Sequence, residues 1–476
     1  MSESSNKEAV SKVAKSGLPA STDVESSLYA KREKIYPREV HGLFAALRVS
    51  GVLVLLGLYY IIPWLEWEGT QLVLFDLPNR KFHIFGIIFW PQDFFYLALL
   101  LIIAALSLFF FTALAGRLWC GYACPQTVWT EVFLWIERKI EGDRPRQMKL
   151  DKAPWTFNKF RIKATKHFIW IIFSLYTGLT FVGYFSPLRE LVGNAFSFNL
   201  GPWEWFWIIF YGFATYGNAG WLREQVCTYM CPYARFQSAM IDNDTLVISY
   251  DTARGESRGK RKKGADPKNQ GLGDCIDCTI CVQVCPTGID IRDGLQYDCI
   301  ACAACIDACD DVMDKMGYEK GLIRYTTENM LHGSTAHFIR PRIIVYGIIL
   351  LAIIASTFYA ISIREPLAMD VLRDRNSLYR ETNKGWIENV YIVKVMNMDN
   401  VTRRYHLTVV GLEGLSFDMD RQDIEVAAGS VIEIPVRAMV DPENLDKRSS
   451  EIQFKLQADH QIDLVISEEA RFIGPR

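Results

Sequence analysis

The stretches CIDCTICVQVCP at 275–286 and CIACAACIDAC at 299–309 decide the fold of the cysteine-rich part of this chain. Each stretch spaces four cysteines as C-x2-C-x2-C-x3-C, the bacterial arrangement that holds a cubic [4Fe–4S] cluster through four thiolates. Where two such runs follow one another, the fourth cysteine of each run binds the cluster of the other run. We therefore expect one cluster on Cys275, Cys278, Cys281 and Cys309, and a second cluster on Cys299, Cys302, Cys305 and Cys285.

Structural zinc sites are the alternative for these eight cysteines. Such sites usually show paired C-x2-C units with longer stretches between the pairs, which is not the pattern here. We therefore favour a ferredoxin-like domain with two [4Fe–4S] clusters over residues 274–340. Two neighbouring clusters indicate one-electron transfer as the chemistry of this region.

The remainder of the chain predicts a membrane protein. Half of the 476 residues are hydrophobic, and the net charge of −2 gives no indication of nucleic-acid binding. The first forty residues are polar, so we expect no cleavable secretory signal. About five segments are long and apolar enough to cross a hydrocarbon core of about 30 Å: 43–63, 93–115, 167–186, 203–220 and 342–363. The weakest is 203–220, which is short and aromatic and contains Glu204, so a buried or interfacial helix is the alternative there.

The distribution of basic residues predicts the orientation of these spans. Lysines and arginines are concentrated in the N-terminal arm and in the segments 116–166 and 221–340. The positive-inside rule therefore places these three regions in the cytoplasm, and five spans place the C-terminus in the periplasm. Reduced cysteines are also expected on the cytosolic side. The basic run from Arg258 to Lys263 is either part of this signal or a contact with anionic lipid headgroups, and Arg48 is expected to reach the cytoplasmic surface.

The other four cysteines form an internal repeat. The motif CGYACP at 120–125 and the motif CTYMCP at 227–232 each follow an even-numbered predicted span. Two spans per unit preserve the direction of the chain, so both motifs should reach the same membrane face, and their four thiols could converge there. Proline suits the first turn of a helix, and the residue before proline is disfavoured in the helical region. We therefore expect Cys124 and Cys231 to begin new helices, the first of them an interfacial helix.

Several roles remain open for Cys120, Cys124, Cys227 and Cys231. A helix N-terminus and a nearby arginine, Arg117 or Arg223, lower the pKa of a thiol, which predicts thiolates that react or bind metal. Soft ligands of this kind favour Cu(I). A redox-active dithiol, a further iron–sulfur cluster and a purely structural role are the alternatives. Met230 could add a thioether ligand, although packing is the more ordinary role for it.

The segment 365–476 has the pattern of a small antiparallel β-sandwich. Apolar residues alternate in five predicted strands, 389–397, 404–411, 430–439, 450–458 and 461–468. This periplasmic domain contains no cysteine and no evident catalytic group. The pair Met396 and Met398 is better explained as the edge of a core than as a copper site. The seven histidines show no spacing that indicates a ligand set.

The fold class is therefore an α-helical membrane protein with an inserted double-cluster ferredoxin domain and a C-terminal Ig-like sandwich. We expect six parts in chain order. They are a cytoplasmic arm at 1–42, a four-span region at 43–240, a basic linker at 241–273, the ferredoxin-like domain at 274–340, a fifth transmembrane helix at 341–364 and the sandwich at 365–476.

This order resembles the cytochrome c oxidase accessory proteins called CcoG, FixG or Rdx. The resemblance rests on the twelve cysteines and on the basic linker YDTARGESRGKRKKG at 250–264. It implies a bacterial inner-membrane protein that assists assembly of the cbb3-type oxidase by reducing Cu(II) to Cu(I). The implied partners are oxidase subunits or copper-delivery proteins, with an unspecified electron donor. The cysteines from Cys275 to Cys309 match the cluster ligands of the family, although Asp310 stands where ferredoxins commonly have proline. Cys120, Cys124, Cys227 and Cys231 match its membrane cysteines.

Three functions are consistent with the sequence. The first is an electron carrier that reduces copper, and the second is a ferredoxin-type membrane subunit that oxidises quinol. The third is an assembly scaffold or redox sensor without catalytic activity.

Overall fold

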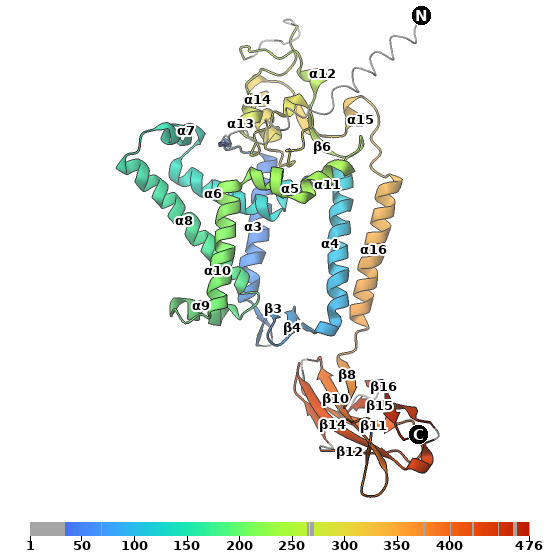
Figure 1. The fold of residues 1–476 in the computed structure, drawn as a ribbon. Helices are drawn as coiled ribbons and strands as arrows, with labels where there is room; N and C mark the ends of the chain where they lie inside the picture. The colour runs from blue at the N-terminus through green and yellow to red at the C-terminus, as the bar shows by residue number, and fades with distance from the viewer. Residues whose placement is uncertain are drawn as a thin grey trace, which may run out of the picture.

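The computed structural model describes residues 34–475 except 68, 264–265, 267–270, 375–376, 400, 421–422, 446 and 460–463. Figure 1 shows three parts in succession: the cysteine-rich region at one end, long helices in the middle, and the C-terminal sandwich at the other end. Within the described residues the chain therefore separates its cysteine-rich region from its sandwich by the length of its apolar helices.

Three helices have the length and composition of membrane spans. The first, α3, covers Leu43–Ile61 and continues to Trp64 as a 3-10 turn; α4 covers Phe94–Ala115, and α16 covers Pro341–Ser362. Figure 1 shows α4 and α16 side by side, with α3 on the other side of α4. Few of their side chains are buried within the chain, as expected for helices that face lipid.

The two remaining predicted spans correspond to α8 (Phe157–Val182) and α10 (Pro202–Thr215). Among the described residues only three helices, not five, are long and apolar enough to be membrane spans. The first half of α8 contains four cationic residues, and α10 has 14 residues where a span needs about 20. The two helices pack closely, because a Cβ at Gly178 would lie 2.4 Å from the Ile208 carbonyl oxygen. That α8 and α10 cross the membrane therefore stays a prediction.

Short helices and strands lie at the two ends of the helical region. At the sandwich end lie α9 (Leu188–Phe196), the pair β1 (Glu66–Trp67) and β2 (Thr70–Gln71), and an antiparallel sheet of β3 (Val73–Asp76), β4 (Lys81–Ile84) and β5 (Ile87–Phe89). At the cysteine-rich end lie α5 (Leu118–Tyr122), α6 (Pro125–Glu141), α7 (Arg144–Lys152), the π-helical turns η3 (Tyr216–Leu222) and η4 (Val226–Met230), and α11 (Pro232–Met240).

The cysteine-rich region has little regular structure of its own. Its main elements are α13 (Ile280–Gln283), α14 (Ala304–Met316) and the antiparallel pair β6 (Val247–Tyr250) and β7 (Ile323–Thr326), with the short helices α12 (Thr252–Gly255) and α15 (Glu328–Leu331) beside them. The buried core includes Ile248, Met313 and Ile323 together with cluster cysteines. A region of this size with so small a core is typical of domains that depend on bound metal for their fold.

The first membrane helix is fixed to this region through its N-terminus. The backbone amides of Phe44 and Ala45 donate to the Asp307 carboxylate of α14 at 3.2 and 2.7 Å. These amides are unsatisfied within α3 itself, so Asp307 provides the cap that the helix lacks locally. A Cβ at Gly42 would lie 2.3 Å from Asp307 Oδ1, which explains a glycine at this contact.

The C-terminal domain is a two-sheet sandwich. One sheet has the order β12-β14-β10-β8, with β9 paired to β10, and the other has the order β13-β11-β15-β16. The strands are β8 (Leu367–Arg373), β9 (Arg380–Glu381), β10 (Ile387–Asn397), β11 (Arg403–Val410), β12 (Ser416–Met419), β13 (Ile424–Val426), β14 (Val431–Val440), β15 (Ser449–Ala458) and β16 (Val465–Ile473). Four of the five predicted strands correspond to β10, β11, β14 and β15, and the fifth begins in residues outside the described part.

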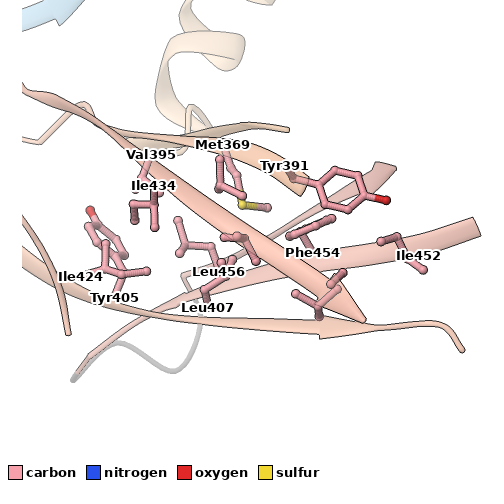
Figure 2. Close-up of a cluster of buried hydrophobic side chains, with 14 of the residues drawn as sticks. Met369, Tyr391, Val395, Tyr405, Leu407, Ile424, Ile434, Ile452, Phe454 and Leu456 are labelled. Carbon is pink, nitrogen blue, oxygen red and sulfur yellow. The ribbon is translucent and has the colours of Figure 1, made fainter. Parts of the chain in front are cut away.

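The core of the sandwich follows the predicted alternation. Tyr405, Leu407 and Val409 of β11 all point into it, as do the alternate residues of β15. Figure 2 shows the side chains of Tyr391 and Phe454 meeting between the two sheets, with ring centroids 5.1 Å apart. The Tyr391 hydroxyl donates to the Arg471 carbonyl oxygen at 3.0 Å, so this buried polar atom is satisfied.

Candidate iron–sulfur and cysteine sites

The two cluster-binding runs have the same backbone conformation. In the first run, Asp277 and Thr279 lie in the left-handed region with φ of 53° and 57°. In the second run, the equivalent residues Ala301 and Ala303 have φ of 54° and 58°. Left-handed conformations are costly for residues other than glycine and cluster at ligand-binding sites. Repetition of the pattern indicates loops shaped so that successive thiols face one point.

Two small cavities lie inside these loops, and cysteines line both. The lining of one cavity includes Cys275, Cys278, Cys281 and Cys309. The lining of the other includes Cys285, Cys299, Cys302 and Cys305, with Cys281 at the boundary between them. These two groups are the interleaved sets that the spacing predicts. Four soft thiol donors around each cavity fit the requirements of a [4Fe–4S] cluster.

An arginine is fixed beside the first cavity, which it lines. Arg292 donates to the carboxylates of Asp290 and Asp277, each at 2.6 Å. The Arg292 side chain is only 9% exposed. Burial raises the pKa of the Cys281 thiol, and the positive charge of Arg292 lies close enough to Cys281 to lower that pKa in part. This residue had no signal in the sequence, because its role depends on contacts between loops.

Both C-x3-C-P motifs adopt the predicted local structure. Cys124 is the N-cap of α6 with Pro125 in the first turn, and Cys231 is the N-cap of α11 with Pro232 in the first turn. In each motif the first cysteine lies in a short helical turn, α5 or η4. The prediction that Cys124 and Cys231 begin new helices is therefore confirmed.

The two motifs bind each other reciprocally. Gln126, just after the first motif, donates to the carbonyl oxygens of Asn218 and Arg223, just before the second motif, at 2.9 and 3.1 Å. In the other direction, Gln237 of α11 accepts from the Cys120 thiol at 3.4 Å. Arg117, just before the first motif, donates at 2.5 Å to the carbonyl oxygen of Ala234 in α11. The two halves of the internal repeat thus fold as one unit, because each half makes hydrogen bonds to the other.

The four thiols lie within electrostatic range of one another, but burial controls the ionisation of Cys120, Cys124 and Cys227. Burial raises the pKa of the Cys120 thiol to about 12, and charge on Cys124, Cys227 or Cys231 would raise it further. Burial also raises the pKa of Cys227 to about 11. The prediction that arginines and helix N-termini make thiolates is therefore wrong for Cys120, Cys124 and Cys227, because burial raises the pKa of each. Arg117 does lower the pKa of Cys120, but less than burial raises it.

The four membrane cysteines do not form a preformed metal site with three or more ligands. Within the described part of the chain, no three histidine, cysteine, aspartate or glutamate side chains are grouped closely enough for a single metal ion. Met230 is 60% exposed. Met396 and Met398 are buried at the top of the sandwich, where their sulfur atoms accept from Gln92 and Arg364, each at 3.4 Å.

The C-x3-C-P motifs contact the second-cluster loop, residues 298–305. A Cβ at Gly121 of the first motif would lie 2.7 Å from the Ala301 carbonyl oxygen. Thr228 of the second motif donates to the Asp298 carboxylate at 3.1 Å. Both motifs therefore touch the loop that carries three predicted ligands of the second cluster. The sequence did not reveal these contacts, because they join segments that are 180 and 70 residues apart.

Arg48 of α3 also makes a hydrogen bond to the second-cluster loop. Its guanidinium group donates to the carbonyl oxygen of Cys302. Arg48 therefore contacts a predicted cluster ligand at this end of α3, and its position at the cytoplasmic surface stays a prediction.

A buried network of charged residues holds Arg223, the arginine just before the second motif. Glu137 of α6 is 1% exposed and accepts from Arg223 at 2.7 Å and from Lys166 at 3.3 Å. Lys166 also pairs with Glu141 at 2.8 Å, and Lys34 of the N-terminal arm reaches Glu137 at 3.3 Å. Burial alone would raise the pKa of Glu137, but the surrounding cations, led by Arg223, lower it to about 2. Arg223 therefore fixes the position of the second motif instead of activating its thiols.

Comparison with known proteins finds iron–sulfur domain families over both C-x3-C-P motifs as well as over the two cluster runs. Residues 97–142 match a 4Fe-4S binding domain and residues 222–328 match a 4Fe-4S dicluster domain. Residues 357–475 match the family described as an IG-like fold at the C-terminal of FixG, putative oxidoreductase. The nitrogen fixation protein FixG of Rhizobium meliloti is 41% identical over 82% of this chain and 81% of its own length. The chain belongs to the FixG/Rdx family.

Two other relatives are about as similar in sequence to this FixG/Rdx chain. Protein RdxB of Cereibacter sphaeroides is 42% identical over 83% of this chain and 86% of its own length. Protein RdxA of the same organism is 41% identical over 86% of this chain and 88% of its own length. The family and its 4Fe-4S domains make the protein an iron–sulfur electron-transfer protein of the FixG type.

Proposed function

We propose that this FixG-type protein reduces Cu(II) to Cu(I) among its four membrane cysteines, where two thiolates are enough to hold Cu(I), for copper loading during assembly of a cbb3-type oxidase. The observation that carries the proposal is the contact between both C-x3-C-P motifs and the second-cluster loop. Gly121 touches the backbone of that loop, and Thr228 binds its Asp298 side chain. A cysteine site placed directly against an electron-transfer centre is suited to one-electron reduction of a soft metal ion.

The chain supplies the ligands for this chemistry in two sets. Cys275, Cys278, Cys281 and Cys309 would hold one [4Fe–4S] cluster, and Cys299, Cys302, Cys305 and Cys285 would hold the other. When bound, each cluster provides a store for one electron. Copper is the substrate: Cu(II) gains one electron, and thiolates favour the Cu(I) product because both are soft. Burial of Cys120 and Cys227 means that binding copper there would release protons from the thiols.

We further propose the sidedness predicted from the basic residues. The cysteine-rich region lies in the cytoplasm of a bacterial inner membrane, and the sandwich lies in the periplasm. Support comes from their positions at opposite ends of the apolar helices (Figure 1). This arrangement leaves the sandwich available to oxidase subunits or copper-delivery proteins.

Anaerobic copper reduction tests the proposal. The purified full chain is reduced, freed of excess reductant and mixed with Cu(II) and a chelator specific for Cu(I). We expect Cu(I) to form in proportion to the electrons stored. The variants Cys120→Ser and Cys227→Ser should lose this activity while their iron content stays unchanged. Met230→Leu is the matched control, because Met230 lies in the same motif but is exposed. Undiminished Cu(I) formation in both serine variants would contradict the proposed site.

A further inference from the structure

A large cavity opens between the first membrane helix and the cysteine-rich region. Its volume is about 1160 Å³, somewhat above the roughly 300–1,000 Å³ of ordinary small-molecule pockets. One wall is a face of α3 that presents Val49, Leu53 and Leu56, and the opposite wall is a face of α6. Val49 and Leu53 are 51% and 68% exposed, so the apolar part of the cavity opens where the helix would meet lipid.

The end of the cavity at the second-cluster loop is polar. Ile300 and Cys302 form part of the lining there, together with Arg48, which donates to the Cys302 carbonyl oxygen. A molecule in the cavity would therefore lie against a predicted ligand of the second cluster. The cavity thus joins a membrane-facing opening to an electron-transfer centre.

An unsatisfied donor also lines the cavity. Arg138 of α6 donates from Nη2 to Glu131 at 3.0 Å, but its Nε is buried and has no hydrogen-bond partner among the described residues. A buried N–H without an acceptor is costly, and it indicates a missing hydrogen-bond acceptor at this position. Arg138 and Glu131 both belong to the lining of the cavity.

The charges in the lining indicate what kind of acceptor is missing. Arg138 is neutralised by Glu131, and Arg223, which also lines the cavity, is neutralised by Glu137 at 2.7 Å. Arg48 also lines the cavity and donates to a carbonyl oxygen instead of a carboxylate, so the donors at the second-cluster end keep a positive charge. Charge-assisted donors of this kind suit a carbonyl oxygen or a phosphate oxygen, and the contact with the second-cluster loop is what favours a redox-active carbonyl compound.

We propose that this cavity binds an isoprenoid quinone. Its two ring carbonyls would accept hydrogen bonds at the polar end, and its apolar tail would lie along α3 and leave through the opening toward lipid. Quinones combine membrane solubility with redox activity, which matches a cavity that joins the lipid phase to the second-cluster loop. The inference stands on the cavity and its lining, and it does not require that copper be the electron acceptor.

Photoaffinity labelling tests the binding site directly. The full chain is placed in nanodiscs of phosphatidylethanolamine and phosphatidylglycerol and labelled with an azido-benzoquinone that carries a short isoprenoid tail. Mass spectrometry then locates the label. We expect labelling on α3 and α6 that saturates and that unlabelled quinone abolishes. Labelling spread over the exposed faces of α4 and α16, or displaced by added phospholipid, would overturn the proposal and identify the cavity as a lipid site.

Two variants and a control separate binding from folding. Leu53→Trp fills the cavity and should abolish the saturable label, whereas Leu101→Trp places the same side chain on an exposed position of α4 outside the cavity and should leave it intact. Arg138→Gln removes the unsatisfied donor and should shift saturation to higher quinone concentration. Iron content is measured in each variant as a check on folding. Full labelling of a Leu53→Trp protein that retains its iron would refute the site, whatever its copper activity.

Discussion

Replacing Gly121 by alanine tests the contact on which the proposed electron path depends. The added Cβ would lie 2.7 Å from the Ala301 carbonyl oxygen and 2.9 Å from the Ile300 carbonyl oxygen. Both are backbone atoms of the second-cluster loop, so no flexible side chain can move aside. The backbone of Gly121 has no positive φ, and alanine is a better helix former than glycine, so local propensity would favour the substitution.

The magnitude follows from overpacking of a tight contact. Inserting a methyl group into a well-packed interface costs about 1–3 kcal/mol. Since 1.4 kcal/mol corresponds to about a tenfold change in an equilibrium constant, docking of the first motif on the loop should weaken by roughly 5- to 150-fold. The motif and the loop would then separate, and electron transfer between them should slow.

The assay compares Gly121→Ala with Gly193→Ala in the full chain. Gly193 lies in α9, and a Cβ there would meet no heavy atom within 4 Å, so this control reproduces the change in helix propensity without the clash. We expect Gly121→Ala to retain its iron but to lower the rate of Cu(I) formation and the thermal midpoint of unfolding. If both quantities match those of Gly193→Ala, the contact between the first motif and the second-cluster loop does not carry the function.

Three further substitutions test other parts of the structure. Asp307→Ala removes the cap of α3 and should cost about 0.5–2 kcal/mol, seen as a lower thermal midpoint of iron release that Asp307→Asn largely restores. Glu137→Gln leaves buried cations uncompensated and should cost about 3–5 kcal/mol. Because the pKa of Glu137 is lowered from 4.5 to about 2, its contribution is complete above pH 4.5 and disappears as the pH falls toward 2; unfolding followed by fluorescence should show a flatter pH dependence in the variant. Phe454→Ala should destabilise the sandwich by about 3–5 kcal/mol, so limited proteolysis should cut the sandwich while iron content is unchanged.

Local sequence signals were sufficient for much of this fold. The spacing of the eight cysteines predicted the two groups that surround the two cavities, and the position of Pro125 and Pro232 predicted the helices that begin at Cys124 and Cys231. Alternation of apolar residues predicted β10, β11, β14 and β15 of the sandwich. Each of these features depends on residues that are close in the chain.

Contacts between distant segments account for what the sequence could not predict. The role of Gly121 depends on Ala301, and the partner of Arg223 is Glu137 instead of a thiol. The pKa of Cys120 depends on burial, which spacing does not show. The helices α8 and α10 were difficult for a related reason, because their charged and short segments resemble both membrane spans and buried interfacial helices.

The cap on α3 has a consequence for how the protein is made. Phe44 and its acceptor Asp307 are 263 positions apart, so the first span leaves the ribosome long before its cap exists. Asp307 lies between Cys305 and Cys309, in the turn of α14 that carries a predicted ligand of each cluster. We expect α3 to be fixed to α14 only after these clusters have been installed. Completion of the membrane domain would then depend on maturation of the metal centres.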